Sequence, residues 1–270
     1  MAVYNVNGIR IDGQSTGGSS RLNNLANTML LIAHRGSSFY PENTMAAAEG
    51  AIETKGYKAI EFDWRFTSDN VPVALHDTTI NSTARNDDGS TIGTTIYIAN
   101  ITYAQALQYD FGIRMGSQYA GQRIPTLEEV LLYCKRKGAM LEMDLGGRVT
   151  TAAQYKIIYD TVQNCGMKDS VIITIAAAEA PNYQALGTDL ILCISGRTDT
   201  SKIDDIDPFV APLKVCSVPL ASVTQNLCDY AHNKGYLVKA WTPNSQVNID
   251  TCVNAHVDWM ITDNFLPSNL

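Results

Sequence analysis

The sequence predicts an α/β fold, a TIM (β/α)8 barrel with a small insertion after an early strand. Three observations predict it. Short β-rich apolar stretches alternate with helical stretches, which is typical of parallel sheets with helical crossovers. The 270 residues suit one barrel, which uses about 250. The Gly-rich loop of dinucleotide-binding sheets is missing, because Arg35 and Ser37 occupy its glycine positions. A doubly wound open sheet is the alternative.

The predicted strands number nine, one more than a barrel needs. The surplus strand belongs either to the hairpin-like region of Glu61 and His76 or to the weak stretch 190–218. Helices are predicted after Pro41, from Thr126 with Glu129 at capping-box spacing, and up to Gly235. The strands cover 30–33, 59–64, 71–75, 139–145, 171–175, 190–194, 213–218, 236–241 and 259–262, and the helices cover 43–54, 126–137, 151–164, 222–233 and 245–255.

Two segments fall outside this alternation. Residues 1–27 are rich in Asn, Gly and Ser and are predicted to form a flexible arm or linker ahead of a barrel domain at 28–270. Residues 78–123 are too long for an ordinary loop between barrel elements. We expect this segment to be an insertion with some structure of its own.

Composition limits the partners. A net charge of -7 and a pI of about 5.0 argue against a polyanion such as nucleic acid held by bulk charge. The six cysteines stand singly, which argues against a zinc site and slightly favours a reducing, cytoplasmic compartment. A secreted or surface-tethered form stays open. No apolar run approaches the ~18 residues that would span a membrane. Oligomeric state is not predicted.

Charged residues end several predicted strands. His34-Arg35-Gly36, Glu61-Phe62-Asp63 and His76-Asp77 close three apolar runs, and Glu142-Met143-Asp144 lies in a fourth. Residues two apart on a strand share a face, so each carboxylate pair points one way. Hard oxygen ligands suit Mg²⁺ or Ca²⁺. The pattern predicts one divalent ion with two imidazole proton carriers and an arginine for phosphate oxygens.

Several motifs in this order resemble the glycerophosphodiester phosphodiesterase family. The resemblance runs from about residue 30 to the C-terminus, and the ordered set is more specific than any one motif. The motifs are His34-Arg35-Gly36, Pro41-Glu42-Asn43-Thr44, Glu61-Phe62-Asp63, Pro72-Val73-Ala74-Leu75-His76-Asp77, Ile124-Pro125-Thr126-Leu127-Glu128-Glu129, Leu141-Glu142-Met143, Trp241-Thr242-Pro243-Asn244 and Ile261-Thr262-Asp263.

The resemblance implies a TIM barrel that hydrolyses small glycerophosphodiesters to glycerol phosphate and an alcohol. It implies that His34 and His76 are the acid and base, with Arg35 on the phosphate. It also implies that Trp241 lines the pocket and that Glu61, Asp63 and Glu142 hold the metal. Glu42 and Asp77 are candidates either for additional metal ligands or for residues that support the site, and Asn43 is predicted to cap a helix.

One position departs from the family pattern. Asp144 stands where the family usually has a lysine, so an anion replaces a cation near the phosphate. Asp144 either joins the metal ligands, or Lys239, on the face of Trp241, supplies the cation from another strand. A third alternative is a site that has drifted to another substrate or lost activity.

Related functions remain as alternatives. The same barrel and paired histidines occur in toxins resembling sphingomyelinase D and in enzymes that trim glycerol-phosphate polymers such as teichoic acid. The insertion speaks against the toxin type, and a flexible arm suits a tethered enzyme that acts on polymers. Lysophospholipid is a further candidate substrate. A binding module that recognises a phosphorylated ligand without turnover is the alternative of another class, and Asp144 is the feature that favours it.

Overall fold

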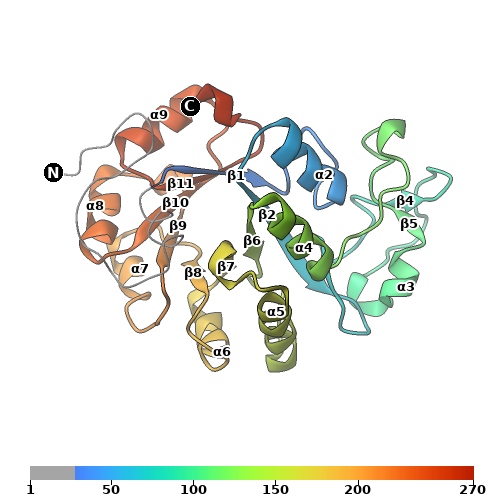
Figure 1. The fold of residues 1–270 in the computed structure, drawn as a ribbon, viewed down its shortest axis with the longest axis horizontal. Helices are drawn as coiled ribbons and strands as arrows, with labels where there is room; N and C mark the ends of the chain where they lie inside the picture. Colours follow the sequence, from blue (N-terminus) through green and yellow to red (C-terminus); the bar gives the residue numbers. More distant parts are fainter. Residues whose placement is uncertain (1–27) are drawn as a thin grey trace.

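Eight parallel strands close into a barrel in the computed structural model, which describes residues 28–270 (Figure 1). The strand order is β1-β11-β10-β9-β8-β7-β6-β2, and β1 also pairs with β2, which closes the ring. The predicted barrel is therefore confirmed, whereas the doubly wound alternative is wrong. The predicted arm, 1–27, lies outside the described residues. The strands are β1 Leu30–His34, β2 Ala59–Phe66, β6 Met140–Asp144, β7 Val171–Ile175, β8 Ile191–Ile194, β9 Lys214–Pro219, β10 Leu237–Trp241 and β11 Trp259–Thr262.

The surplus predicted strand is β3, Pro72–Ala74, which lies outside the ring. It runs antiparallel to the end of β2, with Trp64 opposite Ala74 and Phe66 opposite Pro72. The surplus strand thus belongs to the hairpin-like region of Glu61 and His76, and not to the stretch 190–218. The hairpin carries His76 back toward the end of β2, because the backbone N–H of Leu75 donates to the carbonyl of Asp63 at 2.9 Å.

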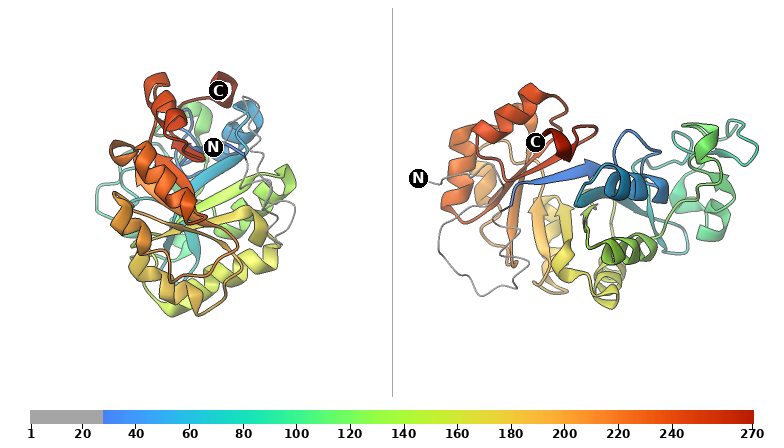
Figure 2. Two further views of the ribbon diagram at one scale, coloured as in Figure 1. Left: turned by 90° about the vertical axis from the view of Figure 1, so that its left-hand side faces the viewer. Right: turned by 45° about the horizontal axis from the view of Figure 1, so that its top comes forward.

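Helices α4 to α9 surround the strands (Figures 1 and 2). Thr126 caps α4, and Glu129 completes the predicted capping box. Two five-residue helices, α6 and α7, were not predicted, because such short segments show too little periodicity. The α-helices are α2 Met45–Glu49, α3 Tyr103–Ala106, α4 Leu127–Lys137, α5 Ala152–Cys165, α6 Ala180–Gln184, α7 Thr200–Asp204, α8 Gln225–Asn233 and α9 Gln246–Asn254; Gly50–Thr54 is a π-helix, and 3₁₀ turns span Ile98–Asn100, Ser117–Tyr119, Lys168–Ser170, Ala177–Glu179, Leu220–Ser222 and Pro267–Asn269.

The barrel interior changes from apolar to polar along the strands. Residues two apart point to the same side of a strand, so Ile32 in the barrel is followed by His34, and Ala59 by Glu61. The inner apolar cluster includes Ile32, Ala59, Met140, Ile172, Leu237 and Trp259. Two residues further along their strands, toward the carboxyl ends, the interior positions are polar and buried: Glu61, Glu142, Thr174, Ser217 and Lys239. The polar site therefore opens at the carboxyl ends of the strands, as is usual for barrel enzymes.

Residues 78–123 stand to one side of the barrel (Figures 1 and 2). They contain α3 and a two-stranded antiparallel pair, β4 Arg85–Asn86 and β5 Tyr109–Asp110. Their apolar side chains, among them Ile80, Ile98 and Phe111, form a cluster of their own with Val73 and Leu75. This small core joins the segment to β3, directly before His76.

Asp110 is a buried carboxylate that organises this segment. Its oxygens accept hydrogen bonds from the backbone N–H groups of Gly112 at 2.8 Å, Ile113 at 2.9 Å and Gly121 at 2.6 Å. Burial alone would raise the pKa of Asp110, but these hydrogen bonds outweigh it and the pKa is lowered. We expect Asp110→Ala to lower the free energy of unfolding by about 2–4 kcal/mol, because the N–H groups lose their acceptor.

Urea unfolding at several pH values checks this expectation. The lowered pKa means that the stabilisation is fully present above the ordinary value of 3.8 and disappears as the pH falls through the folded-state pKa. The difference between wild type and Asp110→Ala should therefore shrink only below that pH. Asp87 is an exposed partner of Arg123 in the same segment, so Asp87→Asn is the control. It should lower the free energy of unfolding by less than about 1 kcal/mol. Equal effects of the two substitutions would contradict the prediction.

All six cysteines are buried and free. Burial raises the pKa of the Cys134 thiol to about 12, which keeps it in the unreactive protonated form. The thiols therefore act as small apolar groups. Among residues 28–270, we find no helix with the length and apolar character that crossing a membrane requires.

Candidate active site

Four carboxylates lie on two neighbouring strands. The parallel register sets Glu61 on β2 opposite Glu142 on β6, and Asp63 opposite Asp144. Glu61, Asp63 and Asp144 each offer an oxygen within 4.8 Å of the others, which is a spacing that suits a metal ion. Glu61, Asp63 and Asp144 thus form one group, whereas Glu142, the third ligand predicted from the sequence, lies outside this set.

The electrostatics of this group favour a cation. Glu61 is fully buried, and burial together with the charges of Asp63, Asp144 and Glu142 raises its pKa well above the ordinary value. Like charges brought together in a low dielectric repel one another unless a positive ion neutralises them.

Arg148 supplies part of that positive charge. Its guanidinium pairs with Asp63 at 3.1 Å and with Asp144 at 3.0 Å, and only 12% of the side chain is exposed. The backbone N–H of Gly146 also donates to Asp144 at 2.9 Å. The turn after β6 therefore holds Asp144 toward β2. Sequence reasoning missed Arg148, because nothing in its loop context shows which way the side chain turns.

Lys239 and Glu142 form a buried pair within the barrel. The ammonium of Lys239 donates to Oε1 of Glu142 and to the hydroxyl of Thr174 at 3.2 Å, and both charged side chains are 1% exposed. Thr174 donates to the same Glu142 oxygen at 2.7 Å. The other oxygen, Oε2, is buried without a hydrogen-bond partner among the described residues. Lys239 is thus engaged by protein atoms, and its predicted contact with substrate stays a prediction.

His34 ends β1 and is oriented by an aspartate from the opposite end of the chain. Its Nδ1 lies 2.6 Å from Oδ1 of Asp263, and its Nε2 lies 3.9 Å from Glu61. Asn244 donates to the second Asp263 oxygen at 2.5 Å. The hydrogen bond with His34 lowers the pKa of Asp263. Because a carboxylate only accepts, Nδ1 carries the proton in this hydrogen bond, and Nε2 is the ring nitrogen that faces Glu61.

His76 has the same kind of support. Its Nδ1 lies 2.8 Å from Asp77, whose second oxygen accepts a hydrogen bond from Ser82 at 2.5 Å. Hydrogen bonds from Ser82 and then His76 lower the pKa of Asp77. Arg65 on β2 donates to the backbone carbonyl of His76 at 2.8 Å. Each predicted proton carrier is therefore held by an aspartate through the same ring nitrogen.

A tight turn places Arg35 beside the carboxylates. Its backbone N–H donates to Glu61 at 2.9 Å, and its guanidinium lies 3.4 Å from Asp63 and 3.3 Å from Glu42. Gly36, at φ +80°, allows this turn, because a Cβ there would meet the Cβ of Ala47 at 2.5 Å. Burial would lower the pKa of Arg35, but the neighbouring carboxylates outweigh it and raise the pKa.

Asn43 contributes to the site rather than to a helix cap. The cap of α2 is Thr44, whose hydroxyl accepts from the N–H of Ala47. Asn43 instead makes two 3.0 Å hydrogen bonds with Asp63, one to the carboxylate and one from its N–H. The predicted cap was therefore wrong by one residue, and Asn43 orients a member of the carboxylate group.

Comparison with known proteins shows to which family the chain belongs. Residues 34–266 match the profile of the "Glycerophosphoryl diester phosphodiesterase family". The chain belongs to this family. The predicted resemblance is thereby confirmed, and the protein is an enzyme, a hydrolase of phosphoric diesters.

Two relatives within this family match the chain over different lengths. The glycerophosphodiester phosphodiesterase of Caldanaerobacter subterraneus is 26% identical over 241 residues, which are 87% of this chain and 93% of that protein. Glycerophosphodiester phosphodiesterase 1 of mouse is 36% identical over 132 residues, 47% of this chain and 37% of that protein. The higher identity to the mouse protein thus concerns about half of this chain.

Solved structures of family members share the fold. A phosphodiesterase from Silicibacter pomeroyi superposes with a TM-score of 0.75 at 22% identity, covering 91% of this chain and 94% of that one. A phosphodiesterase from Oleispira antarctica, solved with the product sn-glycerol-3-phosphate, has a TM-score of 0.71 at 21% identity and covers 87% and 92%. At these identities the agreement concerns the barrel.

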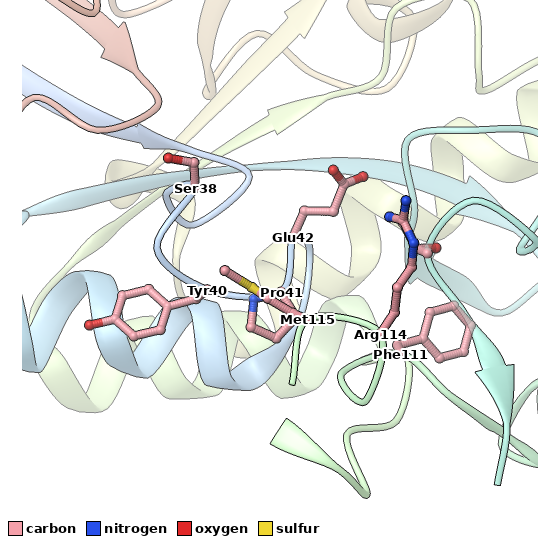
Figure 3. A pocket seen from close by; sticks show the side chains of 8 residues that line it. Ser38, Tyr40, Pro41, Glu42, Phe111, Arg114 and Met115 are labelled. Carbon is pink, nitrogen blue, oxygen red and sulfur yellow. The ribbon is translucent and has the colours of Figure 1, made fainter. Parts of the chain in front are cut away.

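A cavity of about 360 Å³ lies between the loop that follows β1 and the insertion (Figure 3). One wall is formed by the loop that comes after His34 and Arg35 in the sequence. The other wall is formed by the insertion. Trp241, at the end of β10 and 43% exposed, is not among its lining residues. The lining residues are Ser38, Tyr40, Pro41, Glu42, Thr83, Phe111, Arg114 and Met115.

Sequence reasoning missed three residues that act through predicted ones. Asp263 was quoted in a motif without a role, and it holds His34. Arg148 holds Asp63 and Asp144, and Arg65 holds the backbone of His76. The position of Asp263 at the end of the last strand was the available signal, since the last and first strands of a closed barrel are neighbours.

Proposed function

We propose that the enzyme hydrolyses glycerophosphodiesters to glycerol phosphate and an alcohol with the help of a divalent metal ion. The carrying observation is a buried carboxylate group flanked by two His–Asp pairs, His34 with Asp263 and His76 with Asp77. Family membership supports the substrate class. The Oleispira relative, solved with sn-glycerol-3-phosphate, supports the expected product.

The carboxylates fit a resident Mg²⁺ or Ca²⁺. Glu61, Asp63 and Asp144 would hold the ion, and Glu142 would add its buried, unpartnered Oε2. An all-oxygen donor set suits these hard cations. When bound, such an ion polarises the phosphoryl group and neutralises its charge. In this arrangement Asp144 acts with the ligands, and the missing family lysine is balanced by Arg148 and Lys239.

The histidines are proposed to move the protons. Water supplies the oxygen that completes glycerol phosphate. One imidazole takes the proton of the oxygen that attacks phosphorus, and the other gives a proton to the oxygen of the departing alcohol as its bond to phosphorus breaks. Asp263 and Asp77 fix the orientation of each ring through its Nδ1. Arg35, held by Glu42, would bind phosphate oxygens. Trp241 would pack against one arm of the diester.

A substrate panel tests the proposal. Purified protein is given glycerophosphocholine, glycerophosphoglycerol, a lysophospholipid and a short glycerol-phosphate polymer, and ³¹P NMR identifies the products. We expect glycerol phosphate and the free alcohol from the small diesters. Turnover of lysophospholipid alone would replace the proposed substrate class, and no turnover of any compound would overturn the proposal.

Arg148 competes with a metal for the carboxylates, so its removal should tighten metal binding. We expect Arg148→Met to bind Ca²⁺ or Mg²⁺ about tenfold more tightly, which corresponds to the ~1.4 kcal/mol of a charge-assisted contact. Calorimetric titration of the metal-free protein measures this without an activity assay. Arg123→Met, which removes an arginine paired with Asp87 in the insertion, is the control. Unchanged or weaker metal affinity in Arg148→Met would contradict the prediction.

A further inference from the structure

The cavity of Figure 3 joins the two halves of the site. Ser38, Tyr40, Pro41 and Glu42 line it from the loop that follows His34 and Arg35. Thr83 and Met115 line it from the segment that follows His76. Glu42 contacts Arg35 at 3.3 Å. Thr83 follows Ser82, which holds Asp77. A group bound here would therefore lie against Glu42, which contacts the neighbour of His34, and against Thr83, which is next to the Ser82 that holds Asp77.

The surface of the cavity suits something other than a glycerol unit. Glycerol is small and uncharged and needs only hydroxyl partners. The cavity instead offers the aromatic rings of Tyr40 and Phe111, the thioether of Met115 and the charges of Glu42 and Arg114. Figure 3 shows Tyr40 and Met115 on one side of the space and Phe111 with Arg114 on the other. Mixed apolar and charged walls fit the variable alcohol half of a diester.

The charge of the cavity is set by Arg114. The carboxylate of Glu42 is already paired with Arg35. Arg114, by contrast, has no ion pair or hydrogen bond with the residues at 28–270. The net charge of the whole chain is -7, so this positive spot is a local feature of the cavity. An alcohol that carries negative charge would pair with Arg114.

We propose that this cavity receives the alcohol half of the substrate and that Arg114 makes the enzyme prefer alcohols bearing a phosphate or carboxylate group. The inference rests on the proposed function, since it names the substrate class of the same site. Glycerol-phosphate oligomers and deacylated diphosphatidylglycerol belong to this class, because their leaving alcohol carries a further phosphodiester. Choline, which is cationic, does not.

A charge-reversal experiment tests the inference. The specificity constant kcat/KM is measured for deacylated diphosphatidylglycerol, with an anionic leaving alcohol, and for glycerophosphocholine, with a cationic one. The ratio of the two constants is compared in wild type, Arg114→Gln and Arg114→Glu. Because both constants come from one protein sample, differences in folded fraction cancel. Lys58→Glu makes the same charge reversal at an exposed residue just before β2, at the amino end of the barrel.

We expect wild type to favour the anionic alcohol. The ratio should fall about threefold in Arg114→Gln and about tenfold in Arg114→Glu, as exposed charge pairs allow, and it should stay unchanged in Lys58→Glu. Hydrolysis of both substrates with a ratio that Arg114 does not change would overturn this inference and leave the proposed function intact. Hydrolysis of neither substrate by wild type would overturn both.

Discussion

Replacing either His34 or His76 with alanine is expected to lower kcat by about 10²–10⁴-fold, the usual contribution of a positioned proton carrier. Each ring is fixed by an aspartate through Nδ1, at 2.6 Å for His34 and 2.8 Å for His76. Loss of one ring leaves the carboxylate group in place, so metal affinity should change little. Steady-state kinetics on glycerophosphoglycerol, together with calorimetric metal titration, measure both quantities.

His232 is the matched control for these substitutions. It also pairs with an aspartate, Asp258, at 2.8 Å. Asp258 lies directly before β11, at the amino end of the barrel and away from the carboxylates. His232→Ala should therefore lower stability without changing kcat per folded molecule. A loss of less than about tenfold in both His34→Ala and His76→Ala would show that the imidazoles are not the proton carriers.

Lys239→Met is expected to lower the free energy of unfolding by about 3–5 kcal/mol, because it leaves the Glu142 carboxylate buried without its counter-charge. The two side chains are each 1% exposed and in direct contact. The double variant Lys239→Met with Glu142→Gln should recover much of this loss, since no unpaired charge remains. Urea unfolding of the wild type, both single variants and the double variant forms a complete cycle.

The same variants separate two roles of Lys239. If the ammonium binds substrate phosphate, the double variant should have a higher KM than Glu142→Gln alone. If Lys239 only neutralises Glu142, these two variants should have the same KM, and the stability cycle alone should show the coupling. Additive stability effects in the cycle would contradict the buried pair itself.

The polar ends of the strands were predictable because strand periodicity is local. Glu61 with Asp63 and Glu142 with Asp144 share faces by their two-residue spacing, and the structure sets them opposite one another. Asp263 and Arg148 were not predictable in the same way. The role of Asp263 depends on the closure of β11 against β1, and that of Arg148 on the direction of a turn.

The irregular parts of the fold also combine features that local sequence predicts with features that depend on tertiary contacts. The surplus strand β3 has the composition of a barrel strand, but its antiparallel pairing with β2 depends on a tight turn that composition does not determine. Asn43 has the residue type of a helix cap, yet its amide bonds Asp63 instead. The residue type of Asn43 indicates only that its amide can form hydrogen bonds. Its partner depends on the tertiary contacts that bring it to Asp63.

The most direct test of the central claim is activity before and after metal removal. The protein is treated with EDTA, dialysed and assayed on glycerophosphoglycerol with no addition, with Mg²⁺ and with Ca²⁺, while ³¹P NMR follows glycerol phosphate. The carboxylate group of Glu61, Asp63 and Asp144 predicts that activity is lost and that one of the two ions restores it. Full activity in the metal-free protein would contradict the account.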